Sequence, residues 1–219
     1  MTAKPPQSPV AEALRSLEVR WIFPGQLETA VAEWFGRFPA RTESREDTYL
    51  LDPQLRGLSV KVRGGGALEV KVYRGSPGIL EVAGRARGRM QAWQKWSFPF
   101  SPLRADNAGP AGWTPIGKRR RISRFSGASG RVVARGPGPG GEPGCEVELT
   151  EVRAHGRDWW TLGFEATGPA DLLRCELQAI AALVFGRALP AGVEPGPDES
   201  RSYAEWLGWP RAAESEADT

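Results

Sequence analysis

Charged residues recur two positions apart along several short stretches of this chain, with apolar residues between them. The clearest pairs are Glu18 and Arg20, Lys61 and Arg63, Glu69 and Lys71, and Glu146 and Glu148. Side chains of a β-strand alternate between two faces, so each stretch predicts a strand with one ionised and one apolar face. A solvated outer face explains any one strand equally well. Recurrence over several strands favours a curled sheet whose ionised faces share a lumen for an anion and a counter-metal.

The bulk composition fits one β-rich domain. The 219 residues have room for a large core, and nine Trp and eight Phe supply bulky side chains for it. The formal net charge is only +3, so the local distribution of charge matters more. Cys145 and Cys175 lack CxxC spacing and a nearby His, which favours reduced thiols in a cytoplasmic protein over a zinc site. The sequence contains neither an apolar run of membrane-spanning length nor the apolar segment of a signal peptide.

We expect residues 1–14 to form a flexible tail, 15–209 one domain and 210–219 a short acidic tail. Apolar residues at helical spacing predict helices at 26–38 and 169–186, with a shorter helix at 200–207. Strands are predicted at 16–23, 43–51, 58–63, 68–74, 115–125, 130–135, 146–153 and 159–166, with further candidates around 79–82 and 90–100. These elements indicate an α+β fold of about eight or nine antiparallel strands and two or three helices.

The period-two spacing also predicts which side chains face inward. The charged residues expected to point into one lumen are Glu18, Lys61, Arg63, Lys71 and Glu148. The apolar residues expected on the other face, packed beneath helices, are Val60, Val62, Val70, Val72, Val147 and Leu149.

Two charged clusters have more than one interpretation. The basic run from Lys118 to Arg121 splits its charge between the two faces of a strand, which weakens it as a nucleic-acid patch. One of its faces suits phosphate oxygens inside a barrel, while a solvated edge strand is the alternative. Glu146 and Glu148 share a face and, with a glutamate from another strand, suit Mg²⁺. Cross-strand ion pairs with arginines explain the same residues.

The single histidine, His155, is expected in an exposed turn. A catalytic acid or base needs a fixed orienting partner, and the local sequence around His155 supplies none. Gly64-Gly65-Gly66 is expected to join two strands as a hairpin, because the helix that follows a phosphate-binding loop is missing.

Short motifs follow one another in a set order through most of the chain. They are the segments 16–20, 47–52, 58–63, 68–71, 118–122, 145–152, 162–165 and 202–207. This order resembles the CYTH superfamily, also called triphosphate tunnel metalloenzymes, which opens with Glu-x-Glu-x-Lys and closes with a Ser-Tyr-x-x-Leu-Leu helix. In this chain Ser-Leu-Glu-Val-Arg stands at the opening motif and Ser-Tyr-Ala-Glu-Trp-Leu at the closing helix.

The resemblance implies an antiparallel eight-stranded β-tunnel with two or three flanking helices. Its interior is expected to bind a triphosphate together with Mg²⁺ or Mn²⁺, and family members hydrolyse inorganic triphosphate, thiamine triphosphate or RNA 5′-triphosphates, or cyclise ATP. The implied metal ligands are Glu18, Glu148 and Glu165. The implied phosphate ligands are Arg20, Lys61, Arg63, Lys71, Arg119 and Arg121.

Ser16 departs from the family pattern. It stands where the family has the first glutamate, and so removes one charge from the set of metal ligands. Three hypotheses about function follow. The first is a metal-dependent triphosphate phosphohydrolase of weakened activity. The second is a non-catalytic module that binds a triphosphate or nucleotide-like anion. The third is an RNA-binding or interaction protein, with no membrane partner in any of the three.

Overall fold

The computed structural model describes residues 13–52, 54–55, 57–64, 66–99, 112–126, 133–135 and 144–208, with the backbone only at 133–135. The tails expected at 1–14 and 210–219 lie outside the described residues, apart from residues 13 and 14. The domain boundaries therefore stay predictions. No helix in the described ranges is long and apolar enough to cross a membrane.

The helices and strands lie within a few residues of their predicted positions. The helices are α1 (Thr29–Gly36), α2 (Leu173–Val184) and α3 (Tyr203–Leu207). The strands are β1 (Leu14–Pro24), β2 (Arg41–Leu50), β3 (Leu58–Arg63), β4 (Ala67–Val82), β5 (Ala86–Pro99), β6 (Trp113–Ser126), β7 (Val133–Arg135), β8 (Gly144–Ala154) and β9 (Arg157–Thr167). The strands expected at 68–74 and 79–82 are one strand, β4, whose register with β5 shifts around Gly75 and Gly78.

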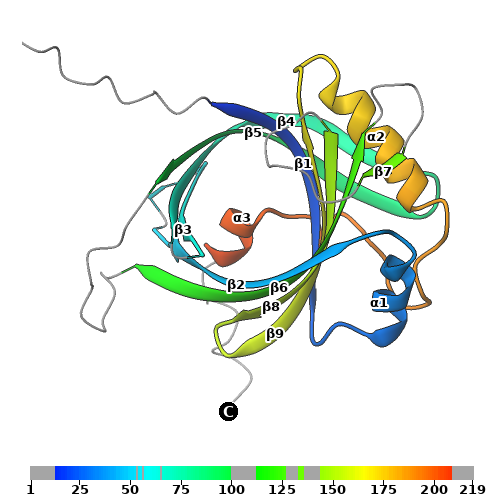
Figure 1. Cartoon of the computed structure of the whole chain (residues 1–219), viewed down its shortest axis with the longest axis horizontal. Helices are drawn as coiled ribbons and strands as arrows, with labels where there is room; N and C mark the ends of the chain where they lie inside the picture. Colours follow the sequence, from blue (N-terminus) through cyan, green and yellow to red (C-terminus); the bar gives the residue numbers. More distant parts are fainter. Residues whose placement is uncertain are drawn as a thin grey trace, which may run out of the picture.

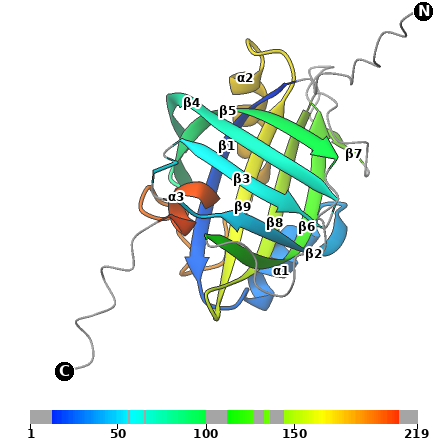
Figure 2. The same cartoon turned by 90° about the vertical axis from the view of Figure 1, so that its left-hand side faces the viewer.

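Within the described residues the strands form one antiparallel sheet in the order β2-β3-β4-β5-β1-β9-β8-β6-β7. β2 also pairs with β6, from Arg41 opposite Ile122 to Leu50 opposite Trp113, so that eight strands close into a barrel. β7 pairs with the far end of β6. Figure 1 looks into the ring of strands, and Figure 2 shows β2, β3 and β4 crossing one side of it at a slant. The barrel confirms the α+β prediction and the eight-stranded closure.

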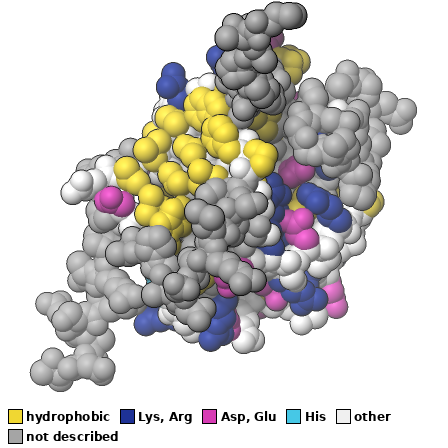
Figure 3. Space-filling view, turned by 60° about the vertical axis from the view of Figure 1, so that its left-hand side comes forward, with side chains coloured by type: hydrophobic (Ala, Val, Ile, Leu, Met, Phe, Trp, Pro, Cys, Tyr) yellow, Lys and Arg dark blue, Asp and Glu magenta, His cyan; other side chains and the backbone are white. Residues whose placement is uncertain are grey.

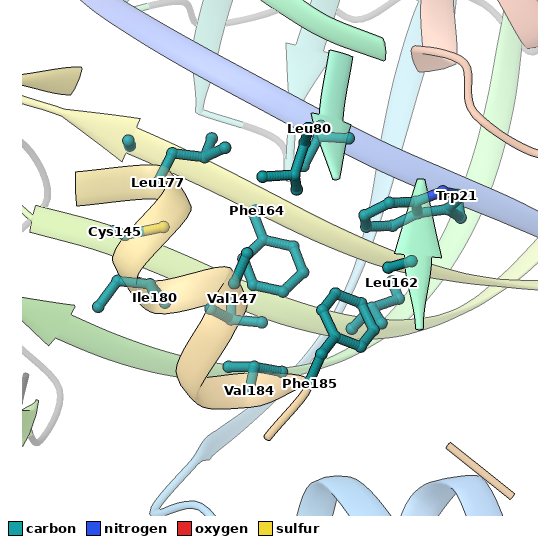
Figure 4. Close-up of a cluster of buried hydrophobic side chains, with 14 of the residues drawn as sticks. Trp21, Leu80, Cys145, Val147, Leu162, Phe164, Leu177, Ile180, Val184 and Phe185 are labelled. Atoms are coloured by element: carbon teal, nitrogen blue, oxygen red, sulfur yellow. The ribbon is translucent and has the colours of Figure 1, made fainter. Parts of the chain in front are cut away.

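The main hydrophobic core lies between the outer face of the barrel and the helices α1 and α2. Outward side chains of β1, β8 and β9 meet one face of α2, as Figure 4 shows for Phe164 and Leu177. Trp21 and Phe185 join them, with the Phe164 and Phe185 rings stacked at 5.7 Å and the Trp21 ring edge-on to Phe164 at 6.1 Å. Buried aromatic rings contribute much of the apolar area in such a core. Because the apolar side chains of these strands point outward, their polar side chains point into the barrel interior.

Among the described residues, no helix covers the outer face of β3, of the first half of β4 or of the second half of β5 in the same way. The other ends of β4 and β5 do join the main core, through Leu80, Ala86 and Met90. Val147 and Leu149 are fully buried in the core beneath the helices, as expected. The same expectation is wrong for four valines that are only half-buried and belong to neither buried cluster: Val60, Val62, Val70 and Val72. The helices follow β1 and β9 through short connections, which keep them on that side of the barrel. Figure 3 shows hydrophobic side chains gathered on the uncovered face.

The β8–β9 hairpin turns at His155 and Gly156. Both residues have positive φ, +50° and +76° respectively, as the central residues of a type I′ turn require. His155 is exposed. The prediction of an exposed turn residue is therefore confirmed.

Two leucines of α2 test how the helix packs on the barrel. Leu177 is fully buried, whereas Leu183 is 43% exposed. We expect Leu177→Ala to lower the free energy of unfolding by about 2–5 kcal/mol, because it leaves a cavity in the core. Leu183→Ala should change it by less than about 1 kcal/mol. Urea unfolding followed by circular dichroism measures both, and equal losses would mean that α2 does not pack through this face.

Candidate functional site

The inward side chains of all eight barrel strands line one cavity. Its volume is about 160 Å³, and the N-terminal end of α3, residues 202–204, contributes to the lining. Figure 1 shows α3 lying within the outline of the ring. A cavity needs a volume on the order of 10–15 Å³ to hold one water molecule. The interior thus has room for a small polar ligand.

Cations outnumber carboxylates in this interior. Ten of the described lining side chains are Lys or Arg and five are Glu. Glu43 and Asp47 form ion pairs with lining side chains and raise the carboxylates to seven. The described interior therefore carries a surplus of three formal positive charges. Each of the seven carboxylates lies within 3.5 Å of a Lys or Arg nitrogen.

Glu148 lies between two arginines. Its Oε1 is 2.5 Å from Arg20 Nη2, and Arg120 Nε donates to its Oε2 at 2.9 Å. Arg120 also binds Glu43 on the neighbouring strand β2. Burial by itself would raise the pKa of Glu148, but Arg120 and Arg20 hold that pKa well below its ordinary value. Glu148 therefore stays ionised and fixes both guanidinium groups.

Gly163 makes room for the Arg20 side chain. The two residues are cross-strand neighbours on β9 and β1. A Cβ atom at position 163 would lie 2.7 Å from Arg20 Cζ, which is closer than carbon atoms pack. The missing side chain lets the guanidinium lie against the barrel wall, within reach of Glu148 and of Thr161, to which Arg20 Nη1 donates at 2.9 Å.

A second cluster surrounds Asp47, whose side chain is fully buried. Lys118 Nζ lies 3.1 Å and Lys61 Nζ 3.4 Å from its Oδ2, and Arg45 Nε lies 3.0 Å from its Oδ1. Burial would raise the pKa of Asp47, but Lys61 and Lys118 hold it well below its ordinary value. Burial lowers the pKa of Lys118, and nearby Lys61 lowers it further. A bound anion beside Lys118 would favour its charged form.

Helix α3 closes over this cluster through Tyr203. Lys118 Nζ lies 4.0 Å from the centre of the Tyr203 ring and Arg20 Cζ 4.6 Å from it, distances typical of cation–π contacts. Ser202 and Glu205 form a capping box at the start of α3, and Glu205 also accepts a hydrogen bond from Gln91 on β5 at 2.8 Å. These bonds fix the helix to the barrel despite its shortness.

A row of glutamates crosses three neighbouring strands. Glu165 on β9 is in register with Glu18 on β1 and with Glu146 on β8. Lys71 Nζ lies 2.7 Å from Glu18 Oε1 and 3.7 Å from Glu165 Oε2, and Lys95 Nζ lies 3.1 Å from Glu165 Oε1. Burial would raise the pKa of Glu165, but Lys71 and Lys95 hold it well below its ordinary value.

The three predicted metal ligands already contact cationic side chains. Glu18 and Glu165 contact lysine ammonium groups, and Glu148 contacts two guanidinium groups. In the described ranges no group of three His, Cys, Asp or Glu side chains is arranged to hold a metal ion. Mg²⁺ requires carboxylate oxygens that are open to it and near-octahedral geometry. The residues as arranged do not fit Mg²⁺ or Mn²⁺.

The structure places seven of the nine predicted site residues in the cavity lining: Glu18, Arg20, Lys61, Arg63, Lys71, Glu148 and Glu165. Their roles as ligands stay predictions. Arg119 and Arg121 instead lie on the outer face of β6, 3.8 Å and 3.3 Å from Glu151. Their placement as interior phosphate ligands is wrong, because β6 turns Lys118 and Arg120 inward.

Sequence reasoning missed several interior charged residues, among them Asp47, Lys95, Lys118 and Arg120. For Asp47 a signal was present, because Glu43, Arg45, Asp47 and Tyr49 alternate with other residues inside a predicted strand. For β6 no such signal exists, because the residues from 118 to 121 place basic side chains on both faces of the strand. The partners on neighbouring strands decide which phase faces inward.

Comparisons with known proteins add little to this geometry. No protein-family model matches the chain, and no curated protein matches it. A solved structure described as a monoclinic form of a mimivirus capping enzyme triphosphatase aligns with 78% of this chain and 89% of that chain. The sequence identity is 9% and the TM-score 0.39, a similarity too weak to support an argument about function.

Acid should destabilise the fold by protonating the interior carboxylates. Burial would raise the pKa of Glu69, but Lys61 and Arg63 lower it from 4.5 to about 2. A carboxylate of this kind adds stability above its unfolded pKa and loses it as the pH falls through its folded pKa. For Glu69 the contribution is on the order of 3 kcal/mol.

We therefore expect the free energy of unfolding to fall between about pH 5 and about pH 2. Glu69→Gln should make this fall shallower, because the substituted side chain no longer takes up a proton. Urea unfolding at stepped pH measures the slope for both proteins. Identical slopes would show that Glu69 is not held ionised by its partners.

Proposed function

We propose that the barrel interior binds a triphosphate-bearing anion, such as inorganic triphosphate, a nucleoside triphosphate or thiamine triphosphate. The observation that carries this proposal is the surplus of three positive charges in a cavity enclosed by eight strands. Cations that outnumber their partners repel one another, and this repulsion is stronger in a site of low dielectric than in water. An entering polyanion relieves it.

The positions of the cations favour a ligand with several charged groups. Arg63, Lys71, Lys95 and Arg120 come from four different strands, β3 to β6, and all line the same cavity. A chain of phosphate groups offers these four side chains more charged oxygens than a single small anion does. Arginine also binds two phosphate oxygens with parallel N–H groups.

Arg63 is suited to be an early contact for such a ligand. Its side chain is 40% exposed, the largest exposure among the cations of the described cavity lining that form ion pairs. Arg63 Nη1 donates to Glu69 Oε1 at 3.1 Å. The guanidinium carries five N–H groups in all, so phosphate contact does not require that pair to break.

Binding is favoured over metal-dependent hydrolysis for a specific reason. Each described interior carboxylate already contacts a Lys or Arg, so the charge that would attract a metal is neutralised within the protein. The RNA-binding hypothesis has less support, because Arg119 and Arg121 on the outer face share the carboxylate of Glu151.

Two arginines of similar exposure provide the test. Arg63 is 40% exposed at the cavity, and Arg119 is 58% exposed on the outer face of β6. We expect wild-type protein to release or absorb heat when titrated with tripolyphosphate, and Arg63→Ala to bind about tenfold or more weakly, because a charge-assisted hydrogen bond contributes about 1.5–3 kcal/mol. Arg119→Ala should bind as the wild type does. Isothermal titration calorimetry, run both in EDTA and in Mg²⁺, measures the affinities.

The result that would refute the proposal is an absence of heat in both buffers with tripolyphosphate, ATP and thiamine triphosphate. Equal weakening by Arg63→Ala and Arg119→Ala would instead show that the anion binds through general surface charge. Release of phosphate, followed in the same samples, reports whether binding is accompanied by hydrolysis.

A further inference from the structure

We propose that the ammonium group of Lys71 serves as a built-in counter-cation for the row of glutamates, so that the barrel binds its polyphosphate without a divalent metal. This inference rests on the proposed function and specifies how the same site is charged. It also predicts that removing the ammonium group turns the row into a site for a divalent cation.

The register of three strands creates the need for a counter-cation. Glu165 lies directly opposite Glu18 on one side and Glu146 on the other. Directly opposed side chains on antiparallel strands have Cβ atoms about 4.5–5.5 Å apart, and like charges at that distance are destabilising. A row of three carboxylates inside a barrel therefore requires positive charge close by.

Lysines from the adjoining strands supply that charge to Glu18 and Glu165, whereas Glu146 lies 3.5 Å from Arg124 Nη1. Lys71 on β4 and Lys95 on β5 are themselves directly opposite one another, so two neighbouring ammonium groups meet two neighbouring carboxylates. Lys71 Nζ contacts both Glu18, at 2.7 Å, and Glu165, at 3.7 Å. Lys95 Nζ contacts Glu165 at 3.1 Å. Lys71 is the group that joins the two carboxylates.

One oxygen of Glu18, Oε1, also accepts a hydrogen bond from a second direction. Ser16 Oγ donates to Glu18 Oε1 at 2.7 Å, the same oxygen that contacts Lys71. Ser16 is 1% exposed, and its hydroxyl needs an acceptor at that depth. A serine at this position therefore satisfies the carboxylate as a hydrogen-bond donor, where a second carboxylate would have added negative charge.

A divalent cation that bound Oε1 of Glu18 would have to displace these groups. Mg²⁺ binds carboxylate oxygens at about 2.0–2.1 Å, and Lys71 and Ser16 already lie against that oxygen. The displaced ammonium groups would then lie beside the metal in a buried interior, without their carboxylates. Lys71 and Lys95 instead remain in the lining, where they can donate to phosphate oxygens.

The test measures metal and anion separately. Mn²⁺ binding is followed by the decrease of the free Mn²⁺ signal in electron paramagnetic resonance, and tripolyphosphate binding by calorimetry in EDTA. We expect wild-type protein to leave the Mn²⁺ signal unchanged and to bind tripolyphosphate in EDTA no more weakly than in Mg²⁺. Lys71→Met should bind about one equivalent of Mn²⁺ and lose tenfold or more in tripolyphosphate affinity in EDTA. Lys71→Arg keeps the positive charge and should behave toward Mn²⁺ as the wild type does.

The wild-type measurements decide the proposal even if Lys71→Met does not fold. Stoichiometric Mn²⁺ binding to wild-type protein, measured without tripolyphosphate because tripolyphosphate itself chelates Mn²⁺, would overturn it. Tripolyphosphate binding that occurs only with Mg²⁺ or Mn²⁺ would overturn it while leaving the proposed anion site intact. An absence of tripolyphosphate binding in every buffer would overturn the proposed function as well. Failure of a folded Lys71→Met variant to take up Mn²⁺ would show that Lys71 does not hold the place of a cation.

Discussion

The pairing of β2 with β6 closes the sheet, and the rest of the structure follows from that closure. Once the ring is shut, every second side chain shares a narrow interior in which an ionised group without a partner is costly. The seam illustrates the solution: Glu43 lies opposite Arg120. The two cations Arg45 and Lys118, which face one another across the seam, share the carboxylate of Asp47. Opposite charges in register help to hold the two strands together. The same pairing extends around the barrel and leaves a surplus of cations.

Charges inside the barrel require the apolar core to form outside it. In many small barrels apolar side chains fill the interior, but here the fully buried Trp21 and Phe164 point away from the lumen and pack against Phe185 at the end of α2. The two helices cover the side formed by β1, β8 and β9, together with Leu80 of β4 and with Ala86 and Met90 of β5. In the described residues, the side formed by β3, the first half of β4 and the second half of β5 keeps an apolar outer surface, in which Phe98 is 41% exposed.

Much of this fold follows from the sequence because local spacing determines it. The alternation around Glu18, Lys61 and Glu148 predicts both the strands and their inward faces. The spacing does not determine which side of the barrel a helix packs on. The outer valines of β3 and β4 were therefore predicted to lie beneath helices, but they are only half-buried. The spacing also does not determine which face of β6 points into the barrel, because Arg119 and Arg120 lie on opposite faces and both carry charge.

The metal ligands show the same limit more sharply. Glu18 and Glu165 were identified correctly as interior carboxylates, but their chemistry depends on Lys71 and Lys95. These lysines belong to strands far from Glu165 in the sequence, and only the register of the closed sheet brings the four side chains together. A carboxylate that awaits a metal and one that is already neutralised have the same appearance in a sequence.

The strand order has a further consequence for how the chain reaches this structure. β1 has two neighbours, β5 and β9, and neither adjoins it in the sequence: Leu17 lies opposite Ala92 on one side and Ala166 on the other. During synthesis β1 therefore emerges well before either partner, and it gains its second neighbour only when β9 is made. Non-local pairing of this kind slows folding. Until then one edge of β1 presents unpaired backbone groups to other chains, which favours aggregation. The pairing of β9 with β1 therefore also ends the period in which the nascent chain is most prone to aggregate.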